Sequence, residues 1–133
     1  MHGASHFILY VADQPRSAAF YAAVLGIAPR LDVSGMTEFT LPNGAILGLM
    51  PEAAIERLLG PALPSPSSAR GTPRAELYLV VPEAANCHAR ALAAGARELS
   101  PMRLRSWGHR AAYSLDLDGH VLAFATDGTA GVV

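Results

Sequence analysis

The same order of predicted elements occurs twice along the chain, and this repeat restricts the fold more than any other feature. The first half begins with a β-branched and aromatic run at 7–11, which is followed by a helical pattern at 16–25. The second half begins with a similar run at 76–81, which matches 6–11 at an offset of 70 residues, and continues into a helical pattern at 84–94. Each helical pattern stops at a glycine, the residue that helices favour just past their last turn. We interpret the repeat as an internal duplication.

Both halves also end in a predicted β-hairpin with an Asx-Gly turn. Asn43-Gly44 separates two apolar runs in the first half, and Asp118-Gly119 does the same in the second. The extended segments after the two helices are 30–33, 36–41 and 45–50, then a piece near Leu99, 111–117 and 121–125. We therefore predict an α+β fold of two βαβββ modules, which form a cupped mixed sheet around a cleft. A cleft of this kind is the natural ligand site.

The length and composition of the chain fit one domain. Its 133 residues are 51% hydrophobic, enough for one sizeable core. We expect a single domain over 1–133, with a first module at 5–50 and a second at 75–127. Between them, 51–74 is predicted to hold a short helix at 52–59 and a linker rich in proline and serine.

Charge and apolar run length argue against several classes of partner. The formal net charge is -1, so no surplus of cations is present to hold a phosphate backbone, and nucleic acid is not expected as a partner. The apolar runs are much shorter than the roughly 20 residues that cross a bilayer, so no membrane association is expected. The first residues lack the features of a signal peptide, and Cys87 is the only cysteine. We expect a cytoplasmic protein.

Motifs near both ends resemble those of one known family. The run from Ile8 to Asp13, with Ser17, Phe20-Tyr21 and Leu25-Gly26, is similar to the opening signature of the glyoxalase/bleomycin resistance protein/dioxygenase family, in the vicinal oxygen chelate superfamily. The segments 107–110 and 116–120, together with Phe124, resemble the closing signature of the same family. The one departure is Leu117, where the family usually has proline. The resemblance implies the fold above and a homodimer. It leaves the activity open among lyases, isomerases, dioxygenases and proteins that only bind a small molecule.

The resemblance also implies where metal ligands would lie. Metal-dependent members place one ligand on each of four strands, and the matching positions here are His6, Gly48, Glu76 and Ala123. His6 and Glu76 are competent ligands, whereas Gly48 and Ala123 carry no donor atom. Unless Glu38 or His109 completes the shell, the set is incomplete. We therefore expect no cofactor, with a divalent metal held by His6 and Glu76 as the alternative.

The remaining candidate site residues follow from strand alternation and loop position. If Leu77, Leu79 and Val81 face a helix, Glu76 and Tyr78 face the cleft, where Glu76 is the candidate general base. Further ligand-binding candidates are Trp107, His109, Tyr113, Phe39 and Glu38. Each has a simpler structural interpretation, because aromatic residues on strands are more often core than pocket and His109 or Glu76 can be a solvated or salt-bridged side chain.

Several kinds of catalysis have no basis in the sequence. The chain has no P-loop, no zinc-protease helix and no lysine for a Schiff base. The favoured hypothesis is a protein that binds a small organic molecule in its cleft without a complete metal site. The alternatives are a metal-dependent lyase, isomerase or dioxygenase, and an interaction module without a ligand.

Overall fold

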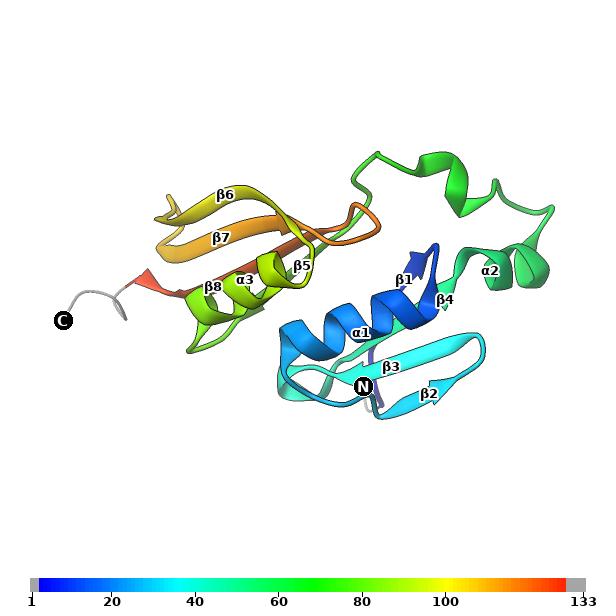
Figure 1. Cartoon of the computed structure of the whole chain (residues 1–133), viewed down its shortest axis with the longest axis horizontal. Helices are drawn as coiled ribbons and strands as arrows, with labels where there is room; N and C mark the ends of the chain where they lie inside the picture. Colours follow the sequence, from blue (N-terminus) through cyan, green and yellow to red (C-terminus); the bar gives the residue numbers. More distant parts are fainter. Residues whose placement is uncertain (1–2, 129–133) are drawn as a thin grey trace. The chain divides into compact units, whose positions relative to one another are not determined.

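The computed structural model describes residues 3–128. The chain divides after Arg70 into two compact units, each containing one four-stranded mixed sheet (Figure 1). The α+β class and the two βαβββ modules predicted from the repeat are confirmed. In the part of the chain described, no helix is long and apolar enough to cross a membrane.

The first unit is a sheet of order β1-β4-β3-β2 with a helix on one face. Strand β1 pairs in parallel with β4, and the other neighbours are antiparallel. The elements are β1 (His6–Val11), α1 (Gln14–Leu25), β2 (Leu31–Val33), β3 (Met36–Thr40), β4 (Ile46–Pro51) and α2 (Glu52–Leu59). Asp13 caps α1 by accepting a hydrogen bond from the Arg16 amide at 3.1 Å, and Gly26 ends the helix in the left-handed region at φ 70°.

Alternation along β1 sets the two faces of this sheet. Leu9 and Val11 are buried, whereas Ile8 and Tyr10 on the other face are half-buried. The buried face packs against α1, which presents Phe20, Tyr21 and Val24. We call the other face, on the side of the sheet opposite α1, the open face of the first sheet. It carries His6, Ile8, Tyr10, Glu38 and Gly48.

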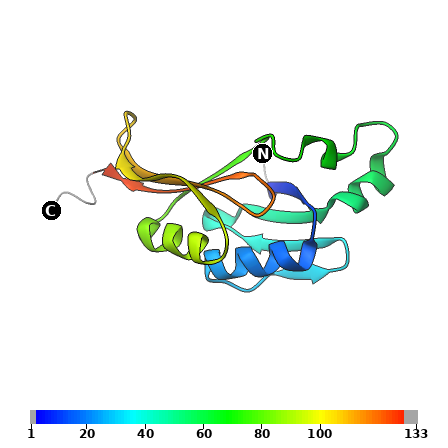
Figure 2. The same cartoon turned by 45° about the horizontal axis from the view of Figure 1, so that its top comes forward.

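The second unit repeats this arrangement with the order β5-β8-β7-β6. Its elements are β5 (Glu76–Val80), α3 (Ala84–Ala93), β6 (Arg97–Leu104), β7 (His109–Leu115) and β8 (Val121–Asp127). Figure 2 shows α3 lying along one side of this sheet, where it packs against β7 and β8. Leu79, Leu122 and Phe124 fill that side, which leaves a second open face with Tyr78, Ala111, Tyr113 and Ala123.

Two segments differ from the sequence prediction. Strand β6 is eight residues long where only a short extended piece near Leu99 was expected, and its pairing with β7 has two register irregularities. Irregular strands lose the regular alternation of buried and exposed residues, which is why the pattern missed it. The predicted linker contains a 3-10 helix at Pro66–Ala69, with Pro66 buried.

Candidate functional site

Three of the predicted site residues form a hydrogen-bonded cluster on the open face of the second sheet. The indole Nε1 of Trp107 donates to the hydroxyl oxygen of Tyr78 at 3.0 Å. The same hydroxyl lies 2.7 Å from Nδ1 of His109, and the two rings stack with centroids 5.8 Å apart at 22°. Because an indole only donates, the Tyr78 hydroxyl accepts from Trp107 and has its own proton available for His109 Nδ1. We call Tyr78, Trp107 and His109 the aromatic cluster.

Small residues beneath the aromatic cluster explain how its rings reach these positions. Ala123 pairs directly with both Tyr78 and Tyr113, so the side chains of all three point to the same face. Ala111, Ala123 and Ala125 are fully buried. Trp107 lies in the β6–β7 turn, where Gly108 adopts a positive φ of 97°. The Trp107 side chain remains 56% exposed. The cluster therefore offers a flat aromatic surface with polar edges.

Tyr113 lies on the same face of the sheet as the aromatic cluster, and the charge of Glu76 affects its pKa. The pKa of Tyr113 is raised, first by burial of its phenol and then by the nearby negative charge of Glu76 and by Tyr78, while Arg105 acts in the opposite direction. The Arg105 guanidinium lies 5.1 Å from the centre of the Tyr113 ring and also donates to the Ala111 carbonyl oxygen. Five predicted residues, Glu76, Tyr78, Trp107, His109 and Tyr113, thus belong to one face of one sheet. Sequence reasoning missed Arg105, because it follows the irregular strand β6.

Replacing Glu76 by glutamine is expected to lower the pKa of Tyr113. A carboxylate beside the phenol disfavours the phenolate, so removing its charge makes deprotonation easier. Ultraviolet difference titration of tyrosinate measures this, and the Tyr113→Phe variant identifies the signal. Glu98→Gln is the matched control, because Glu98 bonds to His88 on α3. Equal titration curves in Glu76→Gln and the unaltered protein would show that Glu76 does not act on Tyr113.

On the open face of the first sheet, the predicted residues His6 and Glu38 meet. Nδ1 of His6 lies 3.4 Å from Oε2 of Glu38, and Nη1 of Arg30 lies 3.6 Å from Oε1. Glu38 is largely buried, and the partly exposed guanidinium of Arg30, which is always charged, compensates the charge of its carboxylate. This pairing gives Glu38 a structural partner in Arg30, which the sequence reasoning did not identify.

The donor atoms of the chain do not fit the four-ligand metal site that the resemblance implied. Glu38 and Ile8 both flank Gly48, and a side chain at Gly48 would collide with Cδ1 of Ile8 and lie 3.1 Å from the Met36 sulfur. An apolar side chain therefore fills the space of a ligand there. Ala123 lies under the aromatic cluster and has no donor atom. Within residues 3–128, no three His, Cys, Asp or Glu side chains are grouped so that they could hold a metal ion.

Phe39 does not lie on either open face. It is fully buried on the α1 side of β3, next to its pairing partner Leu47. Its neighbour Glu38 necessarily points to the other side, because successive side chains alternate along a strand. The structure thus places Phe39 in the core of the first unit.

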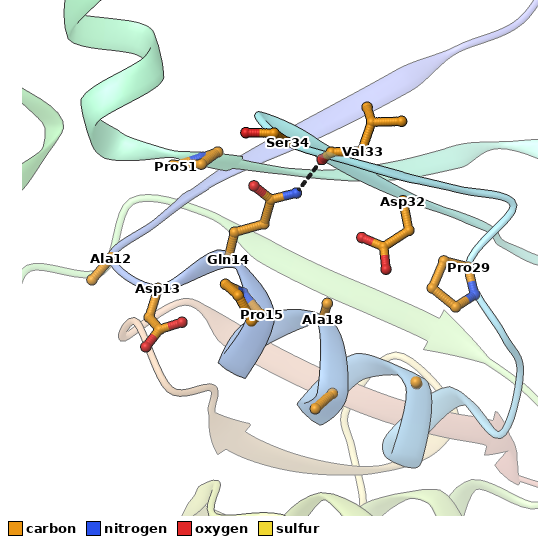
Figure 3. Close-up of a pocket in the computed structure, with 12 residues that line it drawn as sticks. Ala12, Asp13, Gln14, Pro15, Ala18, Pro29, Asp32, Val33, Ser34 and Pro51 are labelled. Atoms are coloured by element: carbon orange, nitrogen blue, oxygen red, sulfur yellow. Dashed lines mark hydrogen bonds between the residues drawn. The ribbon is translucent and has the colours of Figure 1, made fainter.

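A cavity of about 910 Å³ in the first unit is lined by none of the predicted site residues (Figure 3). It runs between the start of α1 and the β2–β3 hairpin, and small or apolar residues such as Ala18 and Pro29 line much of it. Its central polar side chain, Gln14, donates to the Val33 carbonyl oxygen at 2.8 Å and accepts from the Gly35 amide at 3.0 Å. Gln14 therefore ties the hairpin to the helix, and we assign this cavity no ligand.

Comparison with known proteins agrees with the architecture of the two sheets. The family model described as Glyoxalase/Bleomycin resistance protein/Dioxygenase superfamily matches residues 3–124. The chain belongs to this superfamily. No curated protein matches this superfamily member significantly.

Solved structures share the fold of this glyoxalase-superfamily chain. A glyoxalase-related enzyme from Fulvimarina pelagi is 24% identical with a TM-score of 0.76, covering 96% of this chain and 89% of that one. Protein ATC0852 from Agrobacterium tumefaciens is 27% identical with a TM-score of 0.73, covering 96% and 98%. A glyoxalase/bleomycin resistance protein/dioxygenase family enzyme from Burkholderia phytofirmans PsJN is 18% identical with a TM-score of 0.73, covering 92% and 97%. These likenesses extend over the whole fold and do not select an activity.

Proposed function

We propose that this superfamily member binds a small planar organic molecule against the open face of its second sheet, without a complete metal site. The observation that carries the proposal is the aromatic cluster, in which Trp107, Tyr78 and His109 present a flat and partly exposed surface linked by hydrogen bonds. Aromatic rings stack favourably on planar ligands, and the polar edges of the cluster supply donors and acceptors that fix their orientation. Members of the superfamily that only bind a compound need no metal for this.

The fluorescence of Trp107 reports directly on such binding, because it is the only tryptophan in the chain. We expect saturable quenching on titration with at least one planar tricyclic compound of a set that differs in charge: 9-aminoacridine, acridone and 9-anthracenecarboxylate. Free tryptophan titrated in parallel corrects for absorption by the compounds. If all three compounds give only the linear quenching seen with free tryptophan, the proposed surface does not bind planar molecules.

An enzymatic role is the second candidate, and the neighbourhood of Glu76 and Tyr113 favours it. Glu76 supplies a carboxylate that can accept a proton, while burial and the Glu76 charge keep the Tyr113 phenol protonated. A base and a phenol on one face are suited to moving a proton on a bound substrate, as in isomerases and lyases. Once a substrate is found, unchanged turnover in Glu76→Gln would exclude this role for Glu76.

A further inference from the structure

A second pocket lies on the opposite side of the second sheet from the aromatic cluster. It has a volume of about 370 Å³ and is formed where the start of α3 approaches β6, β7 and β8. Arg110 reaches it from β7, directly after His109, so alternation sends these two side chains to opposite faces. The pocket is therefore independent of the ligand surface proposed above.

The guanidinium of Arg110 has no partner within the described residues. Its Nε is buried and makes no hydrogen bond, and no carboxylate lies within ion-pair distance of the side chain. A buried cationic donor without an acceptor is unfavourable, because it has lost water and gained nothing in exchange. An anionic group bound in the pocket would supply the missing acceptor.

The other walls restrict the kind of anion. Pro82, Ala85 and Met102 provide apolar surface, while Glu83 brings one carboxylate, which accepts a hydrogen bond from Asn86 at 2.7 Å. The Glu83 charge disfavours ligands with more than one negative charge. No side chain caps α3, so the peptide N–H groups of its first turn add positive potential beside Arg110.

We propose that this pocket binds a small monocarboxylate with a short aliphatic chain. A planar carboxylate matches the fork of donors on a guanidinium, and it can accept two parallel hydrogen bonds from one edge of Arg110. The apolar walls then receive the aliphatic chain, and the Glu83 charge selects against dianions such as sulfate.

Isothermal titration with hexanoate tests the proposal. We expect saturable binding of hexanoate, and binding roughly tenfold or more weaker for hexanamide, which has the same shape without the charge. Sulfate, a dianion at neutral pH, is expected to bind as weakly as hexanamide. The variant Arg110→Gln should lose hexanoate binding by the same factor, whereas Arg97→Gln, an exposed arginine of the same sheet, should stay within about twofold of the unaltered protein.

Three results would overturn the proposal. These are no saturable binding of hexanoate, equal binding of hexanoate and hexanamide, and equal losses in Arg110→Gln and Arg97→Gln. Circular dichroism checks that both variants fold. If Arg110→Gln does not fold, the comparison of hexanoate with hexanamide on the unaltered chain decides alone. Because the aromatic cluster lies on the other face, Tyr78→Phe should leave hexanoate binding unchanged, which separates this site from the proposed function.

Discussion

Replacing Phe39 by alanine is expected to lower the free energy of unfolding by about 3–5 kcal/mol. The phenyl ring is fully buried on the α1 side of the first sheet, where it lies beside Leu47 and Leu49 of the central strand β4. Removal of the ring forfeits its transfer free energy and leaves a cavity that the surrounding sheet cannot fill completely. Since a domain of this size is stable by only about 5–15 kcal/mol, a loss of this size is a large part of the total.

Phe7→Ala is the matched control for this prediction. Phe7 lies on β1 of the same sheet, but 64% of its surface is exposed, so its loss should cost less than about 1 kcal/mol. Urea denaturation followed by circular dichroism measures both variants. Equal and small losses would mean that Phe39 is not part of the core, and would make it a candidate for the ligand surface again.

Replacing Asp116 by alanine is expected to lower the free energy of unfolding by about 2–6 kcal/mol. Oδ1 of this buried carboxylate accepts hydrogen bonds from the amides of Asp118 and His120, both at 2.9 Å, and Oδ2 lies 3.2 Å from His120 Nδ1. Nε2 of His120 lies 3.0 Å from the Arg74 guanidinium, which only donates, so Nε2 accepts and Nδ1 carries the proton. Without Asp116, two buried donors of His120 lose their acceptor, each at a cost of about 1–3 kcal/mol.

Asp13→Ala is the control for Asp116→Ala, because Asp13 is an exposed helix cap. Its carboxylate accepts one hydrogen bond at the start of α1, so its loss should cost about 1 kcal/mol. Thermal and urea denaturation give both values. A loss in Asp116→Ala no larger than in Asp13→Ala would contradict the view that Asp116 organises the β7–β8 turn.

The repeat predicted the fold well because its signals are local. Gly26 ends α1 in the left-handed region, and Asn43 and Gly44 both adopt positive φ at the predicted turn. Alternation along β5 likewise predicted that Leu79 lies on the face of the second sheet that packs against its helix. These features depend on neighbouring residues along the chain, which a sequence pattern can represent.

Tertiary packing decides which candidate side chains are core and which are exposed, and a sequence pattern does not contain that information. Glu38 and Phe39 were both considered for the ligand surface, although neighbours on a strand must face opposite sides, and only burial shows that Phe39 is the core residue. Arg105 was missed because the bulged pairing of β6 gives no regular period. No sequence motif predicts that Nε of Arg110 lacks a hydrogen-bond partner, because this depends on which residues surround it in the folded chain.

Other expectations from the sequence stay predictions. These are the single domain with its module boundaries, the homodimer, the cytoplasmic setting, and the roles of Glu76 and His6 at a metal. The absence of donor atoms at Gly48 and Ala123 argues against a four-ligand metal site, whatever the arrangement of the two units.

The comparison of Tyr78→Phe with Tyr10→Phe tests the proposed ligand surface most directly. Tyr78 joins Trp107 to His109 through its hydroxyl, whereas Tyr10 lies on the open face of the first sheet, outside this cluster. With a planar compound that quenches Trp107, we predict roughly tenfold weaker binding in Tyr78→Phe and unchanged binding in Tyr10→Phe. Equal affinities in the two variants would contradict the assignment of the ligand to the aromatic cluster.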